Sequence, residues 1–482
     1  MFGLKRRKPR APLDRLLLNW TPSDLLTVRG LLNGGIAVFG RSGSGKTSSS
    51  GKVIGRSVVA YPNSGGLILS AKPEDLAMWQ SIFAGCRRQN DLIVFGSLKD
   101  KWRFNFLDFV SRDGGGTRDV TRCIRTIGET LGGSDAKGHG EDGEFWEQQQ
   151  ERMIYNAVEV VKLGIDKVTA PDLQRFITTA AYSQHQISSE EWQSGYHNQC
   201  LKAAFRRKKT GIESHDYQLA VDYWLSEFPM MADKTRSSIL AGVMGVLHVF
   251  NTGIVRELVS TTTNVTPADL FNGKWVLVNL PPAEWGDIGS FINAGWKYLT
   301  QRANLRRHVN DASRINVIWC DEAQQFVNSF DSHYLAQCRS HSGCMVYLTQ
   351  SLHSYYSALK GESGRHQADA LLSNFHHKLF HALGDVQTAE WASSLIGKSL
   401  QTFIGGSSHD GGDMFDTMFG RTNYTGNFSE HYEQILQNNA FLSGLRTGGP
   451  ANNFLADAIL VRSGEPFSSG LSYLPCTFSQ KG

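Results

Sequence analysis

The hydrophobic residues of this chain fall into two alternating patterns. Short runs that are apolar at every position recur in the first quarter of the chain and again after about residue 270, and stretches with helical spacing separate them. Runs that are apolar on both faces are typical of parallel strands buried between two layers of helices. We predict such strands at residues 36–39, 67–69, 92–95, 275–279, 317–320, 345–348 and 378–380.

The stretch from residue 112 to residue 262 has the second pattern. Its apolar residues recur three and four positions apart, and no run within it is convincing as a strand. This spacing gathers apolar side chains on one face of each helix. The residues that show it most clearly are Phe145, Trp146, Met153, Ala157, Val158 and Val161, followed by Ile239, Val243, Val246, Leu247 and Phe250.

Together these patterns predict an α/β fold with a mainly parallel sheet, interrupted by an all-α insertion domain. We assign residues 30–111 and 263–482 to the sheet domain and residues 112–262 to the insertion. Residues 1–29 are predicted to be a basic N-terminal extension. Glycine, serine, asparagine and aspartate become frequent beyond about residue 400, and residues 405–412 are typical of a loop.

One segment fits the phosphate-binding loop pattern G-x-x-x-x-G-K-[ST] at every fixed position. It follows the predicted strand at 36–39 and precedes a segment that we predict to be helical to about residue 60. This arrangement lets backbone N–H groups face a phosphate at a helix N-terminus. Lys46 would place its charge at the β- and γ-phosphates, and the Thr47 hydroxyl would ligate Mg²⁺. The predicted nucleotide-binding residues are Gly40, Arg41, Ser42, Gly43, Ser44, Gly45, Lys46, Thr47 and Ser48.

Two adjacent acids, Asp321 and Glu322, follow the apolar run at 317–320. Ligands of parallel sheets lie at the carboxyl ends of the strands, so we expect both acids beside the phosphate loop. Asp321 is predicted to hold Mg²⁺ through water, and Glu322 to polarise the attacking water. Many strands end in acidic residues. Two adjacent acids together with a phosphate-binding loop are, however, typical of proteins that hydrolyse nucleotides.

Two further polar residues are candidates for the same chemistry. Gln350 follows the predicted strand at 345–348 and could sense the γ-phosphate, or be an ordinary loop residue. Arg339 lies near the end of a predicted short helix. It could act as an arginine finger on a neighbouring subunit's γ-phosphate, or form a surface salt bridge. Lys72 would lie near the nucleotide, and no role is assigned to it.

Composition and charge exclude few classes of protein. With 482 residues and a net charge of +4, the chain has the composition of an ordinary globular protein. Contacts with nucleic acid would therefore have to come from local patches. Basic clusters occur at residues 5–10, 206–209 and 302–307, although a solvated face explains each of them. Seven cysteines without zinc-site spacing favour reduced thiols.

No apolar run in the sequence approaches the roughly 18–20 residues that cross a bilayer. The basic N-terminus is followed by Asp14, Arg15 and Asn19, which a signal peptide would not contain. We therefore expect a cytoplasmic protein that associates with a membrane only through partners.

The phosphate loop and the paired acids, together with several other segments, resemble the TraG-like coupling ATPases of type IV secretion. That family belongs with FtsK and HerA among the RecA-like ring motors. The matching segments span most of the chain, in the order and at the spacing that the family has. They lie at residues 40–47, 70–75, 104–108, 145–146, 234–239, 266–270, 273–281, 320–324, 339–350 and 371–378.

The resemblance implies a RecA-like P-loop NTPase core with an all-α insertion, which binds ATP and Mg²⁺. It implies a homo-hexameric ring that moves DNA and recruits a relaxase-bound strand to secretion-channel proteins. It also supports Arg339 as the finger and Gln350 as the sensor. There are two departures: many members carry aspartate where Ser70 stands, and most have N-terminal transmembrane helices, which this sequence does not show.

Two other functions remain open on these residues. A nucleotide-gated platform could dock a protein substrate on the insertion domain without processive movement. A HerA-like helicase in DNA repair or defence would share the same nucleotide site. Measuring ATPase activity with single- and double-stranded DNA would separate a motor from a platform.

Overall fold

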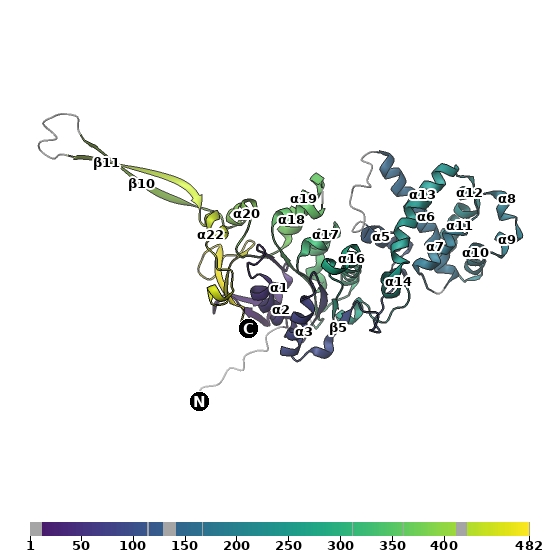
Figure 1. Ribbon diagram of the computed structural model, residues 1–482, viewed down its shortest axis with the longest axis horizontal. Coiled ribbons are helices and arrows are strands. Elements are labelled where there is room, and N and C mark those ends of the chain that lie inside the picture. Colours follow the sequence, from purple (N-terminus) through teal and green to yellow (C-terminus); the bar gives the residue numbers. More distant parts are fainter. Residues whose placement is uncertain are drawn as a thin grey trace.

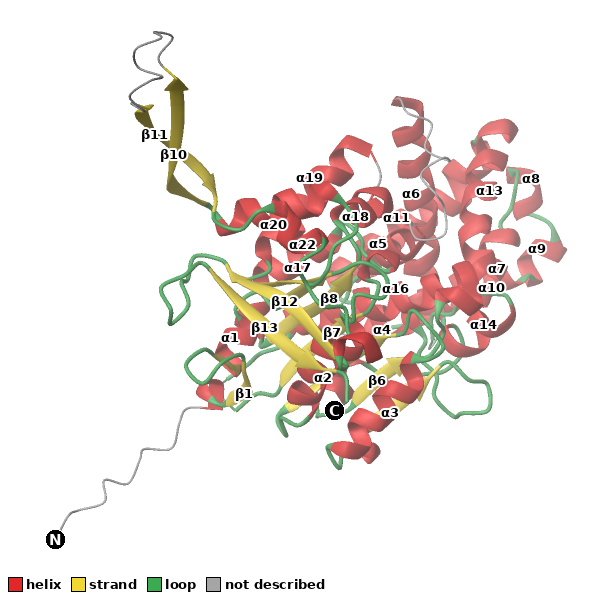
Figure 2. Ribbon diagram, turned by 60° about the vertical axis from the view of Figure 1, so that its left-hand side comes forward, coloured by secondary structure: helices red, strands yellow, loops and turns green. Residues whose placement is uncertain are grey.

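The computed structural model describes residues 12–112, 115–128, 141–165, 167–310, 312–359, 361–410 and 422–481, and the basic cluster at 5–10 lies outside these ranges. Nine of the described strands form one sheet (Figure 2). In spatial order they are β13 (Tyr473–Ser479), β12 (Leu455–Arg462), β9 (His377–Phe380), β3 (Ile36–Phe39), β8 (Gly343–Thr349), β7 (Ile315–Cys320), β4 (Ser64–Leu69), β6 (Trp275–Val278) and β5 (Leu92–Phe95).

The seven strands from β9 to β5 all run parallel, which confirms the predicted mainly parallel α/β sheet. Each of them corresponds to one of the predicted apolar runs. The sequence did not predict β12 and β13, which pair antiparallel at one edge of the sheet. Alternate residues of β13 are exposed, as an edge strand allows, so it lacks the continuous apolar run on which the strand predictions were based.

Helices cover both faces of the sheet, and side chains alternate between the two layers. In β3, Ile36 and Val38 pack with the first layer, while Ala37 and Phe39 pack with the second. The first layer contains α1 (Val28–Leu32), α2 (Lys52–Val59) and α3 (Asp75–Gly85). The second contains α16 (Pro282–Arg306), α17 (Phe330–Gln337), α18 (Leu352–Leu359), α19 (Gly361–Asn374) and α20 (Val386–Ile396).

Between the neighbouring strands β5 and β6 the chain forms a region in which every described element from residue 106 to residue 259 is helical (Figure 1). The entry and exit segments lie side by side, because Phe104 N donates to Leu258 O at 2.8 Å and Asn105 N to Thr262 O at 3.1 Å. The helices are α4 (Phe106–Arg112), α5 (Thr117–Gly128), α6 (Glu141–Gly164), α7 (Ala170–Thr178), α8 (Gln184–Ile187), α9 (Glu190–Ser194), α10 (Tyr196–Arg206), α11 (Gly211–Asp222), α12 (Phe228–Met230), α13 (Asp233–Phe250) and α14 (Gly253–Val259), and α15 (Pro267–Phe271) then leads into β6.

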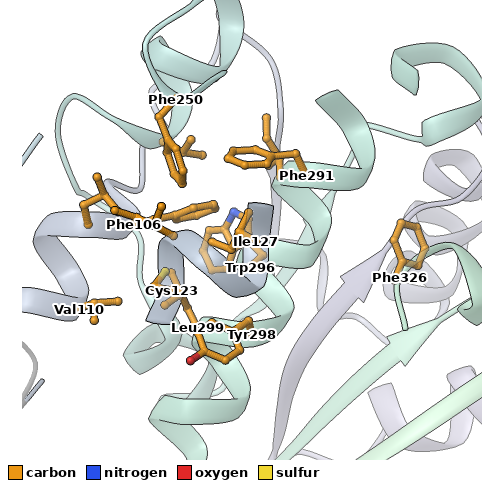
Figure 3. Close-up of a cluster of buried hydrophobic side chains, with 14 of the residues drawn as sticks. Phe106, Val110, Cys123, Ile127, Phe250, Phe291, Trp296, Tyr298, Leu299 and Phe326 are labelled. Carbon is orange, nitrogen blue, oxygen red and sulfur yellow. The ribbon is translucent and has the colours of Figure 1, made fainter. Parts of the chain in front are cut away.

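An apolar cluster joins this helical region to α16 of the sheet layer (Figure 3). The Phe250 and Phe291 rings meet edge to face with centroids 4.7 Å apart. Phe104 and Trp296 are closer still, at 4.4 Å. Aromatic pairs of this kind add to the free energy gained by burial. The long helix α16 is therefore shared between the two parts of the structure.

Three smaller elements complete the fold. Strands β1 (Leu16–Asn19) and β2 (Leu25–Thr27) form a hairpin whose Leu26 is buried against the first helix layer. Strands β10 (Lys398–Asp410) and β11 (Thr422–Gln434) form a long antiparallel ribbon (Figure 1), and α22 (Asn438–Leu442) follows it. The loop predicted at 405–412 was wrong for residues 405–410, which belong to β10. Strand β10 is held by backbone hydrogen bonds to β11, which form without apolar side chains.

Among the described residues, no single helix is long and apolar enough to span a bilayer, and one bent pair, Asp233–Phe250 with Gly253–Val259, meets the length and composition criteria only when taken together. All seven cysteines lie in the described part of the chain, and all are free.

A buried ion pair lies between α16 and α17. Lys297 Nζ is 2.6 Å from Asp331 Oδ2, and both side chains are fully buried. Asp331 also accepts hydrogen bonds from Gln301 Nε2 at 2.8 Å and from the Tyr347 hydroxyl at 3.0 Å. The Lys297 amine donates to Phe326 O as well. This network ties α16 to the segment that follows the paired acids.

We predict that Lys297→Met lowers the free energy of unfolding by about 3–5 kcal/mol, because it leaves the Asp331 charge buried without a partner. The double variant Lys297→Met/Asp331→Asn removes both charges and should recover at least half of that loss. Urea denaturation followed by tryptophan fluorescence measures both. A single variant no less stable than the double variant would contradict this role of the ion pair.

Candidate nucleotide-binding and hydrolysis site

The predicted site residues meet at the carboxyl edge of the parallel strands. The glycine loop follows β3, Gln350 follows β8, and the acids Asp321 and Glu322 follow β7. Because β3, β8 and β7 are neighbours in the sheet, these three segments lie next to one another. The structure therefore brings together residues that are about 300 positions apart in the sequence.

The loop has the backbone conformation that its glycines allow. Gly43 and Gly45 have φ of +74° and +85°, which residues with side chains rarely adopt. A Cβ at Gly40 would lie 2.4 Å from Ser44 Oγ, so this position has no room for a side chain. The helical segment begins with a single π turn, Thr47–Gly51, and continues as α2. Its first amides point out of the helix end, where they lack intrahelical acceptors.

Two direct contacts connect the loop with the acids. The Thr47 hydroxyl donates to Asp321 Oδ2 at 2.9 Å. The Lys46 amine lies 3.4 Å from Glu322 Oε1, and only 6% and 4% of the two side chains are exposed. A hydroxyl and a carboxylate in contact are a suitable pair of protein ligands for Mg²⁺, which keeps most of its other ligands as water and phosphate.

Glu322 is held by a shell of polar side chains. Its Oε2 accepts hydrogen bonds from Gln324 Nε2 at 2.8 Å and from Gln350 Nε2 at 3.1 Å. Its Oε1 accepts one from the Lys72 amine at 3.0 Å. Glu322 has a left-handed backbone with φ of +48°, an uncommon conformation for a residue with a side chain. The carboxylate is thereby fixed in one orientation.

Charge and burial shift the pKa values of the two acids in opposite directions. Burial alone would raise the pKa of Glu322, but the Lys46 charge and the hydrogen bonds from Gln324 and Lys72 lower it to about 2. Burial also acts on Asp321, and there it prevails over the Thr47 hydrogen bond and raises the pKa. Glu322 is therefore ionised at neutral pH.

Several residues that the structure places here had no role in the sequence-based prediction. Lys72 contacts Glu322, and Gln324 bridges Glu322 and the Thr349 hydroxyl. Asp75 accepts the backbone N–H groups of Ala71 and Lys72, which orients that turn, and burial followed by the charge of Asp321 raises its pKa to about 6. No periodicity marks such residues, because each acts through a contact with a distant segment.

Arg339 is not brought to this site. It lies in the short turn Cys338–His341 that precedes β8, at the opposite end of the strands from the glycine loop. Its guanidinium is exposed and donates to Asn33 Oδ1 at 2.8 Å. It cannot reach the acids of its own chain, and a role in a neighbouring subunit stays a prediction.

Gln480 and the segment that follows β9 also border the glycine loop. Gln480 Nε2 donates to the exposed Ser48 hydroxyl at 2.7 Å. His381 follows β9, and its Nε2 is 2.7 Å from Ser50 Oγ on the inner side of the first helical turn. Arg41 and Ser42 are exposed at the rim, and the Arg41 amide donates to Ala382 O at 2.9 Å.

The residues present fit a magnesium-bound nucleoside triphosphate. The buried Ser44 hydroxyl has no hydrogen-bond partner among the described residues, although buried hydroxyls normally have one. The space around Gly43 is open, since a Cβ there would meet no atom within 4 Å. Unpaired donors, open space and a buried lysine are the features that an anionic phosphate chain requires.

Comparison with known proteins agrees with this fold. Residues 316–441 match the family described as the TraM recognition site of TraD and TraG. No curated protein matches the sequence. Among solved structures, the bacterial conjugative coupling protein TrwBdeltaN70 in its unbound monoclinic form is similar with a TM-score of 0.59 at 13% identity, over 98% of this chain and 91% of that chain.

Two further similar structures contain nucleotides. The plasmid coupling protein TrwB in complex with a non-hydrolysable ATP analogue, ADPNP, aligns with a TM-score of 0.55 at 13% identity, over 95% of this chain and 90% of that chain. TrwB in complex with ADP and Mg²⁺ aligns with a TM-score of 0.57 at 13% identity, over 95% and 89%. At this level of identity, the similarity concerns the fold.

The fold is thus the RecA-like α/β fold of P-loop proteins, as predicted. Within that class, the match over residues 316–441 and the fold together confirm the resemblance to the TraG-like type IV coupling ATPases.

We predict that acidification destabilises this edge of the sheet through His381. The ring is fully buried, and burial lowers its pKa to about 4. Between about pH 6.5 and pH 4 the unfolded chain binds a proton that the folded chain does not. The free energy of unfolding should therefore fall as the pH falls, by about 2 kcal/mol at pH 5 from this ring.

Urea denaturation at pH 7.5 and pH 5 tests this, with His381→Leu as the comparison. The variant should lose about 2 kcal/mol less than the original chain between the two pH values, whatever its stability at pH 7.5. An equal loss in both would contradict the prediction.

Proposed function

We propose that this chain is an ATP-driven DNA translocase of the conjugative coupling type, which hydrolyses ATP between the subunits of a hexameric ring. The observation that supports this most is the assembly of Lys46, Thr47, Asp321, Glu322 and Gln350 at one edge of the sheet. The TraG-like family resemblance supports the coupling role.

In this proposal each polar group at the edge has one task. Gly40–Ser48 amides and Lys46 bind the phosphates, and Thr47 and Asp321 hold Mg²⁺. When bound, Mg²⁺ neutralises charge on the phosphates. Ionised Glu322 accepts a proton from the attacking water, and Gln350 orients that water or the terminal phosphate.

The position of Arg339 supports the proposed ring assembly. Its guanidinium is exposed at the opposite end of the strands from its own acids. A head-to-tail contact would bring that end of one subunit to the glycine loop of the next, and such contacts close into rings when the rotation permits. Arg339 would then stabilise charge on the neighbour's nucleotide.

We further propose that residues 30–111 with 263–482 act as the motor domain and residues 112–262 as an all-α domain that contacts substrates. Phosphate contacts would make DNA binding independent of sequence and sensitive to salt. The family description of residues 316–441 supports a relaxosome partner, such as a relaxase-bound strand. Attachment to a secretion channel would come from such partners, with the chain itself on the cytoplasmic side.

One observation favours a second function, a nucleotide-gated platform that recruits a protein. The helical region has exposed apolar side chains, among them Phe205 at 74%, Ile212 at 77% and Met230 at 77% exposure. Exposed apolar groups suit protein docking. ATPase activity stimulated by DNA supports the translocase, whereas stimulation by a partner protein alone supports the platform.

We predict that Glu322→Gln lowers ATP turnover by about 100- to 10,000-fold, the usual contribution of a general base. Nucleotide affinity should not decrease, because the change also frees Lys46 from its carboxylate partner. Phosphate release with and without DNA measures the first effect, and equilibrium binding measures the second. Turnover close to that of the original chain would contradict the role of Glu322.

We predict that Arg339→Ala lowers turnover by about 1,000-fold, the lower end of the range for arginine fingers. Co-assembly of Arg339→Ala with Glu322→Gln should restore part of the activity, since a mixed interface joins an intact acid to an intact arginine. The matched control replaces Glu322→Gln by the double variant and should restore nothing. Equal activity in the two mixtures would show that Arg339 does not act across the interface.

A further inference from the structure

The position of the acids fixes which way a bound triphosphate would point. Glu322 and Gln350 follow β7 and β8, on one side of β3. The reacting end of the triphosphate belongs beside them. The nucleoside end must therefore lie on the other side of β3, which faces β9, β12 and β13.

The antiparallel strands bring a specific segment to that side. Strand β12 begins and β13 ends at the edge of the glycine loop, because Leu455 pairs with Ser479 and β12 runs antiparallel to β9. A Cβ placed on Gly45 would lie 3.0 Å from Ala456 Cβ and 3.1 Å from Thr447 O. The segments before β12 and after β13 thus form a wall against the glycine loop.

Gln480 connects this wall to the nucleotide side of the loop. Its Nε2 donates to Ser48 Oγ at 2.7 Å, and its Oε1 accepts from Gly449 N at 2.7 Å. Ser48 is the residue after Thr47, at the end of the loop from which the nucleoside would extend. Both ends of the Gln480 amide are in use, so the amide itself is not free to read a base.

Phe454 lies next to Gln480 in a strained backbone conformation. Gln480 N donates to Phe454 O at 2.8 Å. Phe454 has φ of +61°, and Asn453 before it has φ of +54°. A left-handed conformation is costly for a phenylalanine, and such outliers cluster at functional sites. The exposed Lys481 amine lies over the ring, 4.4 Å from its centroid, so that face of the ring is accessible from solvent.

We propose that the base of the bound nucleotide stacks on the Phe454 ring, in the place that Lys481 occupies in this structure. Displacing an exposed lysine from a ring costs little, and a base–aromatic stack replaces it. The inference rests on the proposed nucleotide site and adds a base subsite to it. Since every base has a flat face, this subsite accepts nucleoside triphosphates without strong choice of base.

The test compares ATP with inorganic triphosphate, which lacks the base, in calorimetric titrations with Mg²⁺. Phe454→Ala should weaken ATP binding by about tenfold, the loss expected from one base–aromatic stack, and leave triphosphate binding within twofold. The matched control is Phe205→Ala, because Phe205 also has a lysine amine over its ring, Lys209 Nζ at 5.9 Å from the centroid, but lies in the helical region. It should change neither affinity.

A second variant separates loss of the stack from loss of the fold. Phe454→Gly removes the ring but suits the positive φ, so its melting temperature should equal or exceed that of the original chain while its ATP affinity falls as in Phe454→Ala. ATP affinity unchanged in both variants, or triphosphate affinity lowered equally with it, would overturn the base subsite alone. Failure of the unaltered chain to bind either ligand would overturn the proposed function together with the subsite.

Discussion

The buried charge balance between the glycine loop and the two acids is the constraint on which the rest of this structure depends. Lys46 and Glu322 are almost completely buried, and their opposite charges lie 3.4 Å apart. Uncompensated buried charges are costly, so the two elements must stay together in the absence of a ligand. A bound phosphate chain would offer Lys46 a second anionic partner, and Lys72, half-exposed, would remain with Glu322. The contacts of Lys46 and Thr47 with the two acids thus hold the glycine loop against the end of β7.

The second helix layer connects the acidic segment with the helical region. Asp331 follows the acids by ten positions and is locked to Lys297 on α16. On the same helix, Phe291 packs against Phe250 of the helical region, and Trp296 packs against Phe104 in the segment that leads into that region. Packed side chains and one buried ion pair therefore connect the acidic segment with the helical region.

The parallel sheet and the glycine loop were predictable because local sequence determines them. The run at 36–39 is apolar at every position, and the loop that follows needs glycine where φ is positive. The pairing of Asp321 and Glu322 with the loop was predictable from a general property of parallel sheets, whose strands all end at one edge. The residue contacts within that edge, such as Lys72 and Gln324 with Glu322, were not predictable, because they depend on side-chain positions that only the folded chain sets.

The two antiparallel strands, β12 and β13, were not predicted from the sequence. Strand β13 contains Pro475 and alternates buried and exposed residues, so it lacks an uninterrupted apolar run, whereas β12 has a buried one at residues 458–461 that we did not predict to be a strand. An edge strand needs only one buried face, and a proline is tolerated there. The sequence therefore gave no reason to expect Gln480 and Phe454 beside Ser48. The loop expected at 405–412 failed for a related reason, since pairing with β11 stabilises β10 without apolar residues.

A crystal structure of the chain with Mg²⁺ and a non-hydrolysable ATP analogue tests the buried charge balance most directly. We expect the phosphates on the Gly40–Thr47 amides, the metal at Thr47 and Asp321, and the Lys46 amine moved from Glu322 onto phosphate. An intact Lys46–Glu322 contact, with no phosphate at the loop under saturating nucleotide, would contradict this expectation.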